Sequence, residues 1–149
     1  TYRATGGPNS KPSLDFDGGD ILANTNAAFD MASPFSVVAI GNWDNPAGDG
    51  IAVASGADEF YMGSISNVWT VAGTTSATAD DASAHLFVGC VLAGSDQADV
   101  DGTQVIGVDF VAPYWNNGIQ IGGAFGGYKW DGDICFVGCY DSGDVRSDG

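Results

Sequence analysis

Few residues in this chain have the types and spacing that acid–base chemistry requires. Glycosidases use two carboxylates on either side of a groove, and Glu59 is the chain's single glutamate among 19 acidic residues. Asp131 and Asp133 are two residues apart, so a strand would point both carboxylates to one face. His85 is the single histidine, a candidate general base or a structural hydrogen-bonding group. No Gly-x-Ser-x-Gly or His-Glu-x-x-His motif occurs. We therefore predict that the protein is not an enzyme.

The aspartates suggest a second kind of chemistry, the binding of calcium. Calcium takes carboxylate and carbonyl oxygens from loops, and Asp44 and Asp49 lie in one loop while Asp58 lies in another. None of these matches the spacing of an EF-hand. Calcium is therefore one interpretation, with Asp44, Asp49 and Asp58 as candidate ligands. The other is that the aspartates keep the protein soluble in a saline or marine setting.

Aromatic residues beside amides are the third candidate feature, because sugars stack on aromatic faces and need fixed polar groups around them. Trp43 precedes Asn45 in one predicted loop, and Tyr114, Trp115 and Asn116 are consecutive in another. We take these five residues as candidate ligand-binding residues. Core packing is the open alternative for Trp43 and Trp115, since large aromatics are mostly buried. Trp69 and Trp130 are expected in the core.

The elements that must position these residues are short strands. Hydrophobic residues make up 44% of the chain, and glycine accounts for 23 of its 149 residues. Bursts of apolar and β-branched residues separated by Gly, Asn, Asp and Ser are typical of a sandwich or barrel. Strands are predicted at 13–17, 35–40, 50–54, 60–63, 68–72, 85–92, 99–105 with an Asp-Gly turn, 107–111, 119–122 and 134–140. Residues 73–84 are predicted to be a surface loop, and residues 26–31 could form one helical turn.

The charge of the chain argues against one class of partner, and its hydropathy argues against another. The net charge is −15, with only four basic residues. Phosphate recognition needs clustered cations, so nucleic-acid binding is not expected. The absence of an apolar run of about 18 residues argues against insertion into a membrane.

The three cysteines are an odd number and form no disulfide framework. Small buried hydrophobic side chains are the favoured interpretation of Cys90, Cys135 and Cys139. A bridge from Cys90 to Cys139 or to Cys135 is the alternative.

Taken together, the strand motifs resemble those of the laminin-G-like branch of the concanavalin A-like jelly rolls. The resemblance rests on Leu14–Gly18, Phe35–Ile40, His85, Val100–Thr103, Ile121–Gly123 and the run Trp130, Gly132, Ile134, Val137, Tyr140, Asp141. It departs from the family at Ile40, where tryptophan is common, and at residues 142–144, where Arg-Ala-Leu is usual. It implies an all-β, two-sheet antiparallel jelly-roll sandwich, in one domain over residues 1–149 with its core at about 13–141.

The resemblance and the missing catalytic set favour a recognition or adhesion module on an extracellular, cell or virion surface. Its partner would be a glycan or a protein receptor, with calcium as an assisting ion. This hypothesis predicts that the Trp43 loop and the Tyr114–Trp115 loop are exposed and close together. The alternative is a structural subunit of a virion or surface assembly, such as a capsid decoration or fibre module, which would contact neighbouring subunits as a homo-oligomer. A glycosidase or lyase ranks last.

Overall fold

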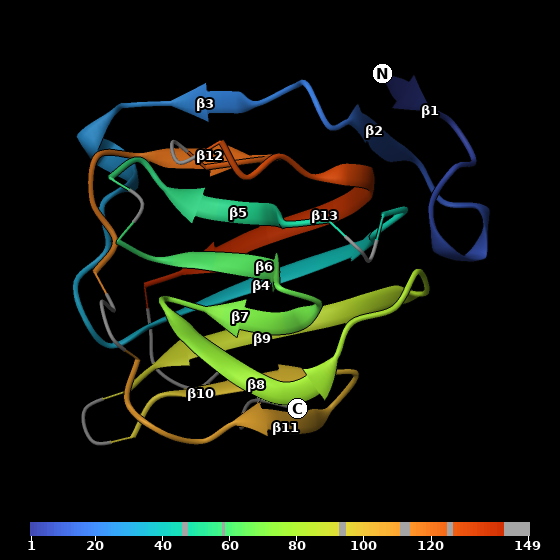
Figure 1. The fold of residues 1–149 in the computed structure, drawn as a ribbon. Coiled ribbons are helices and arrows are strands. Elements are labelled where there is room, and N and C mark those ends of the chain that lie inside the picture. Colours follow the sequence, from blue (N-terminus) through green and yellow to red (C-terminus); the bar gives the residue numbers. More distant parts are fainter. Residues whose placement is uncertain (46–47, 58, 93–94, 111–113, 125–126, 142–149) are drawn as a thin grey trace.

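The chain folds as two antiparallel sheets packed face to face (Figure 1). The structure is a computed structural model that describes residues 1–45, 48–57, 59–92, 95–110, 114–124 and 127–141. The seven-stranded sheet has the order β1 (Tyr2–Arg3), β2 (Ser13–Asp17), β13 (Asp131–Tyr140), β4 (Phe35–Asn42), β9 (Ala84–Val91), β10 (Gln97–Val100) and β11 (Thr103–Ile106). The six-stranded sheet has the order β3 (Leu22–Asn24), β12 (Ile119–Ile121), β5 (Gly50–Ser55), β6 (Tyr61–Ile65), β7 (Val68–Val71) and β8 (Thr74–Ala79).

This arrangement confirms the predicted all-β jelly-roll sandwich. Two 3₁₀ turns, η1 (Pro8–Ser10) and η2 (Ala27–Phe29), are the helical elements of the described residues. The predicted turn near residues 26–31 is therefore present as η2, capped by the Asn26 side chain, which accepts a hydrogen bond from the Ala28 N–H. No helix in the described ranges is both long and apolar enough to cross a membrane.

The core lies between the sheets and is rich in aromatic residues. Residues at alternate positions of β4, such as Phe35 and Val37, are fully buried in one cluster with Phe60, which precedes β6, and Met62 of β6. Trp130 is fully buried, and Trp69 is 3% exposed, as the sequence predicted. Trp69 stacks edge to face on Phe87, with ring centroids 4.8 Å apart.

Two predictions about the middle of the chain were wrong. Residues 73–84 are not simply a loop, because they contain β8, which pairs with β7 at the edge of the six-stranded sheet. Residues 107–110 form no strand; the last residue of that prediction, Val111, lies outside the described residues. Strand β8 was missed because Thr74–Ala79 has no large apolar residue, and one face of an edge strand can stay in water.

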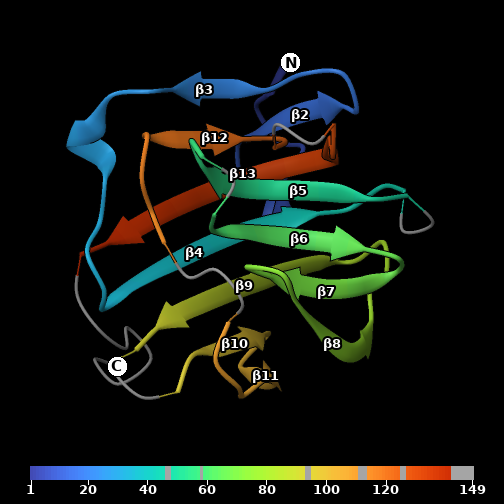
Figure 2. The ribbon, with the colours of Figure 1, turned by 60° about the vertical axis from the view of Figure 1, so that its left-hand side comes forward.

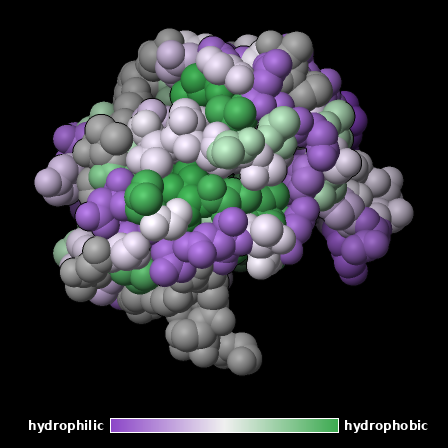
Figure 3. Space-filling view, turned by 60° about the horizontal axis from the view of Figure 1, so that its bottom comes forward, coloured by the Kyte–Doolittle hydropathy of each residue, from purple (hydrophilic) through white to green (hydrophobic). Residues whose placement is uncertain are grey.

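The two long edges of the sandwich differ. At the lower edge of Figure 1, β8 and β11 come into contact and join the sheets. Figure 3 tilts this edge forward and shows a band of hydrophobic residues bordered by hydrophilic ones. At the opposite edge, where β2 and β12 lie, a cavity opens between the sheets. Figure 2 shows from a second side that β13 extends well past the short strand β2 at this edge.

Candidate ligand-binding site

Three loops meet at one end of the sandwich and form the site that the sequence partly predicted, here called the Tyr114 loop site. They comprise residues 114–118, the β5–β6 turn at 55–60, of which residue 58 lies outside the described residues, and the η2 segment at 26–31. All three lie at the left-hand end of Figure 1.

Hydrogen bonds between backbones hold these loops together. The Met31 N–H donates to the Trp115 carbonyl oxygen at 3.1 Å, and the Gly56 N–H donates to the Gly118 carbonyl oxygen at 3.0 Å. The Asp30 carboxylate accepts a hydrogen bond from the Gly118 N–H at 3.0 Å. Because the contacts join segments distant in sequence, the site has a fixed backbone.

Glycine permits this close approach. A Cβ atom at Gly56 would lie 1.7 Å from the Asn117 carbonyl oxygen, which no side chain can tolerate. Gly118 has a φ of +87°, and a Cβ there would lie 1.9 Å from the Asn24 carbonyl oxygen. Both positions therefore require glycine for the three loops to meet.

The predicted residues Tyr114, Trp115 and Asn116 fall into three different environments. The Tyr114 side chain is 64% exposed. Trp115 is 2% exposed and packs on Phe35 and Phe60, with ring centroids 6.1 and 5.5 Å away. Its indole therefore anchors the loop and offers no face to a ligand, so the packing alternative holds for Trp115.

Asn116 is half-buried beside Tyr114 and is linked to the one glutamate of the chain. Its Nδ2 donates to Oε2 of Glu59. The Glu59 and Phe60 N–H groups both donate to the Ser55 hydroxyl oxygen, at 3.1 and 3.2 Å, which fixes the turn that carries Glu59. Oδ1 of Asn116 is buried without a hydrogen-bond partner in the described part of the chain. A group that donated to it would remove the cost of this unmet acceptor. Sequence analysis missed Glu59 as a member of this site because the contact spans 57 residues.

Trp43 was the second predicted aromatic platform, and the structure contradicts its exposure. It is 1% exposed and packs on Trp130, with ring centroids 4.6 Å apart. It also lies far from the Tyr114 loop site, because Trp115 packs on Phe35 at the start of β4 and Trp43 follows the end of that strand. Eight residues of strand span about 26 Å. The two predicted loops are therefore not neighbours.

The remaining predicted residues lie near Trp43 on the surface. Asn45, Asp44 and Asp49 are exposed. Oδ1 of Asp44 accepts a hydrogen bond from Asn42, and Oδ1 of Asp49 accepts one from the Ser66 N–H at 2.7 Å. The third candidate calcium ligand, Asp58, lies outside the described residues. Within the described ranges, no three His, Cys, Asp or Glu side chains come together as a metal site. Calcium binding stays a prediction.

His85 lies between two carboxylates away from this site. Its Nδ1 is 2.6 Å from Asp101 and its Nε2 is 3.0 Å from Asp81, while its ring stacks edge to face on Trp69. Burial alone would lower the pKa of His85, but the hydrogen bonds to Asp101 and Asp81 outweigh burial and raise it above its ordinary value. Both ring nitrogens are occupied, so the structural role of His85 is confirmed by its contacts.

Asp133, but not its predicted partner Asp131, is shown in a polar cluster on β13. Asp133 is 4% exposed, accepts a hydrogen bond from the Ser13 hydroxyl at 2.7 Å, and lies 3.6 Å from the Arg3 guanidinium. The pKa of Arg3 is raised, chiefly by its hydrogen bond to Asp15. Asp131 lies opposite Asp17 of β2 in the register of the sheet. The contacts of Asp133 therefore hold β1, β2 and β13 together.

Comparison with solved structures places this arrangement among known sandwiches. Domain 4 of AbnA, an extracellular GH43 arabinanase from Geobacillus stearothermophilus solved in complex with arabinotriose, superposes with a TM-score of 0.74. The alignment covers 99% of this chain and 77% of that one at 8% identity. A Trypanosoma rangeli sialidase, in complex with the inhibitor DANA, superposes with a TM-score of 0.67 at 13% identity. This alignment covers 95% of this chain and 27% of the sialidase chain.

The likeness is one of fold. At these identities it shows a shared β-sandwich and nothing about residues in a site. No protein-family model matches the chain, and a search of curated proteins finds no match. The jelly-roll assignment is thus supported by topology and by superposition, while the laminin-G-like branch is supported by the sequence motifs alone.

Proposed function

We propose that the protein is a non-catalytic glycan-recognition domain that binds an oligosaccharide at the Tyr114 loop site. The observation that carries the proposal is an exposed tyrosine in the same loop site as a fixed carboxylate–amide pair. Tyr114 is 64% exposed while its neighbour Trp115 is buried, and Asn116 and Glu59 are bonded to each other. An aromatic face covers the apolar face of a sugar ring, and oriented polar groups bind its hydroxyls.

The solved structures support the ligand class. The arabinanase domain of the same fold was solved with arabinotriose, so this sandwich can hold an oligosaccharide. The sialidase shares the fold as part of a glycosidase chain. Because one fold serves both roles, it cannot distinguish binding from hydrolysis, and the residues of this chain must supply that argument.

The contacts of the carboxylates favour binding over hydrolysis. A glycosidase needs one carboxyl group to donate a proton and a second to act as base or nucleophile. At the Tyr114 loop site, Glu59 is bonded to Asn116 and Asp30 accepts the Gly118 N–H. The second candidate pair has Asp133 buried and bonded to Ser13. A laminin-G-like module on an extracellular or other exposed surface is part of the same proposal and is supported by the sequence motifs. Calcium as an assisting ion also belongs to it, on the basis of the loop aspartates Asp44, Asp49 and Asp58.

A glycan array probed with the labelled protein, with and without calcium, tests the proposal. We expect binding to a restricted set of oligosaccharides, and a loss of at least about tenfold in affinity for Tyr114→Ala. The control is Tyr128→Ala, which removes an exposed tyrosine elsewhere. Equal losses in both variants, or no binding by the wild type, would overturn the proposal. Hydrolysis of a bound glycan that Glu59→Gln abolished would overturn the non-catalytic part.

A further inference from the structure

The second half of β13 has a free edge. Strand β2 pairs with β13 over Asp131–Ile134 only, whereas β4 pairs with the other side of β13 as far as Tyr140. Among the described residues, no strand pairs with the outer side of residues 136–140. Figure 1 shows this part of β13 running past the end of β2. Such an edge presents unpaired backbone N–H and C=O groups.

This edge lacks two of the features that keep strand edges from pairing, and a β-bulge between Ile134 and Phe136 marks where it begins. Proteins usually protect an exposed edge with a charged side chain, especially lysine, or with proline. Residues 135–140 read Cys-Phe-Val-Gly-Cys-Tyr and contain neither, in a chain with a net charge of −15. Phe136 is 43% exposed and Tyr140 is 41% exposed. Their rings converge over Gly138, where a Cβ atom would lie 2.9 Å from each of them.

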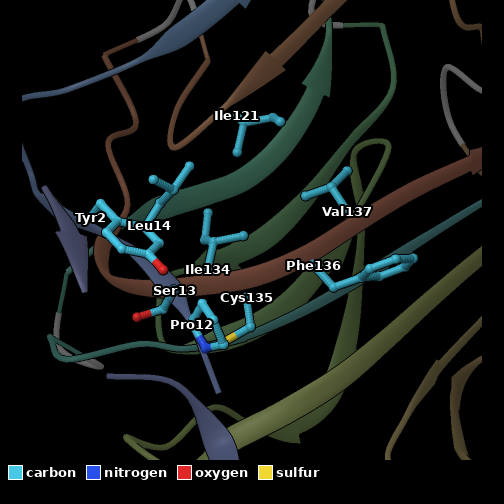
Figure 4. A pocket seen from close by; sticks show the side chains of 9 residues that line it. All are labelled: Tyr2, Pro12, Ser13, Leu14, Ile121, Ile134, Cys135, Phe136 and Val137. Atoms are coloured by element: carbon cyan, nitrogen blue, oxygen red, sulfur yellow. The ribbon is translucent and has the colours of Figure 1, made fainter. Parts of the chain in front are cut away.

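A cavity of about 380 Å³ adjoins the free edge (Figure 4). Its walls come from both sheets: Tyr2, Pro12, Ser13, Leu14, Ile121, Ile134, Cys135, Phe136 and Val137. The lining is almost wholly apolar, which suits a hydrophobic side chain better than a sugar hydroxyl. The cavity therefore differs in chemistry from the Tyr114 loop site.

The edge and the cavity fit a single kind of ligand. Side chains of a strand point alternately to its two faces. A strand added beside residues 136–140 would direct every second side chain inward, to the cavity lined by Ile121, Ile134 and Val137. The other side chains would point outward beside the rings of Phe136 and Tyr140. Backbone hydrogen bonds would supply affinity, and the cavity would select the inward residues, as in β-strand addition.

Charge selects the outward residues. The chain has 19 acidic and four basic residues, so a cationic segment would be attracted and an acidic one repelled. The exposed faces of Phe136 and Tyr140 can also take cation–π contacts from Arg or Lys. A second copy of this chain fits less well, since each copy has a net charge of −15 and residues 135–140 contain no basic residue. The nearby Arg3 is already paired with Asp15 and Asp133.

We propose that the free edge of β13 and the adjoining cavity bind an extended segment of another protein in which apolar residues alternate with Lys or Arg. The segment adds a strand to the seven-stranded sheet and places its apolar side chains in the cavity. This site lies outside the Tyr114 loop site and does not depend on glycan binding.

Binding of a fluorescent peptide, measured by polarisation, tests the proposal. The probe is an acetylated, amidated peptide of alternating Val and Lys, about eight residues long, which spans the edge at about 3.3 Å per residue. Two further peptides carry N-methyl groups on every second amide, one on the Val residues and the other on the Lys residues. In a strand, the N–H groups of alternate residues point to opposite edges, and only one edge of the peptide can bond to β13. We therefore expect one methylated peptide to bind normally and the other to weaken at least about tenfold.

Two variants of matched charge complete the test. Phe136→Lys puts a cation on the free edge and is expected to weaken the unmethylated peptide at least about tenfold. Val108→Lys makes the same charge change at a residue that follows β11 at the opposite edge and is 60% exposed, and should leave binding unchanged. Equal binding by both methylated peptides, or equal effects of both variants, would mean non-specific attraction to an acidic surface and would overturn the proposal. The wild type could instead bind no peptide and sediment as a dimer that Phe136→Lys dissociates. That result would mean that the edge pairs with a second copy, and it would overturn the proposal.

Discussion

His85 shows at the scale of one residue how the fold depends on protonation. Its pKa is raised above its ordinary value of 6.5 by Asp101 and Asp81. The pKa values of these two carboxyls are both lowered below 3.8. The Ser83 N–H is the chief cause for Asp81. Burial would raise the pKa of Asp101, but the hydrogen bonds from the Leu86 N–H and from His85 outweigh burial and lower it. The protonated histidine and the ionised carboxylates are thus the forms that the fold stabilises.

The first prediction is a pH-dependent contribution of His85 to stability. A histidine whose pKa is higher in the folded state stabilises the fold fully below its unfolded pKa, and this contribution is lost as the pH rises through the folded pKa. We expect the difference in unfolding free energy between wild type and His85→Gln to be largest at about pH 5 and to shrink by about pH 9. Urea titrations at several pH values measure it. Thr103→Ala, at an exposed position of β11, is the control, and a pH-independent difference for His85→Gln would contradict the assignment.

The second prediction concerns calcium at Asp44 and Asp49. If the loop that contains both aspartates binds calcium, added calcium should raise Tm more than an equal concentration of magnesium does. The reason is that magnesium demands a tighter octahedral shell. The double variant Asp44→Asn, Asp49→Asn should lose this extra rise. Scanning calorimetry measures both values. The same Tm in calcium and magnesium would remove these residues as ligands.

Burial of single aromatic residues was the least predictable part of the site. Trp43 and Tyr114 both lie in loops beside amides, yet Trp43 is 1% exposed and Tyr114 is 64% exposed. The difference arises from contacts between distant segments. Trp43 itself packs on Trp130. In the other loop it is Trp115, the neighbour of Tyr114, that packs on Phe35. Local sequence contains no signal for such contacts, whereas Trp69, inside a strand, was correctly placed in the core.

At the scale of elements, β13 carries much of the architecture because both β2 and β4 pair with it. Its glycine at position 132 has a φ of +147°, and a Cβ there would lie 2.1 Å from the Asn42 carbonyl oxygen. The close approach brings β13 against the end of β4, beside the Asp44 N–H, which donates to the Asp131 carbonyl oxygen at 2.7 Å.

The third prediction is that Gly132→Ala is far more destabilising than alanine at another glycine of positive φ. The clash with backbone should cost about 3 kcal/mol or more. Gly102 has a φ of +76° in the Asp-Gly turn between β10 and β11, with nothing within 4 Å of an added Cβ. Gly102→Ala should therefore cost about 1 kcal/mol, from the backbone conformation alone. Urea unfolding of both variants checks this, and similar values would contradict the packing around Gly132.

Strands with strong local signals were predicted well, and very short ones were not. The Asp-Gly hairpin at β10 and β11 and the central strands β4 and β9 lie where the sequence places them, because turn residues and apolar runs are local signals. β1 and β3 are two and three residues long and were missed, since they exist through pairing with β2 and β12. The free edge of β13 could not be predicted either, because it depends on where the antiparallel strand β2 begins.

At the scale of the whole molecule, the excess of acid opposes folding. The net charge is −15, and some of the aspartates face each other across strands, as Asp17 and Asp131 do. Like charges directly opposite each other destabilise a sheet. Salt screens this repulsion, with a Debye length of about 10 Å at 0.1 M and about 3 Å at 1 M.

The fourth prediction is therefore a stability that rises with salt. We expect Tm to increase by a few degrees between about 10 mM and about 500 mM NaCl. In the wild type, Oδ1 of Asp17 accepts a hydrogen bond from the Gly19 N–H at 3.0 Å. Asp17→Asn keeps this acceptor and removes one charge of the facing pair. It should raise Tm at low salt and have little effect at high salt. A Tm that falls as NaCl is added would contradict this account.

The most direct test of the central claim is an amide-resolved NMR titration with the oligosaccharide that binds best on the array. The fifth prediction is that shift changes concentrate at residues 114–118, 55–60 and 26–31, and that residues 136–140 of β13 stay unchanged. This result would locate the glycan on the exposed Tyr114 and the Glu59–Asn116 pair. Shift changes that cluster elsewhere and leave the amides around Tyr114 unmoved would contradict the assignment of the site.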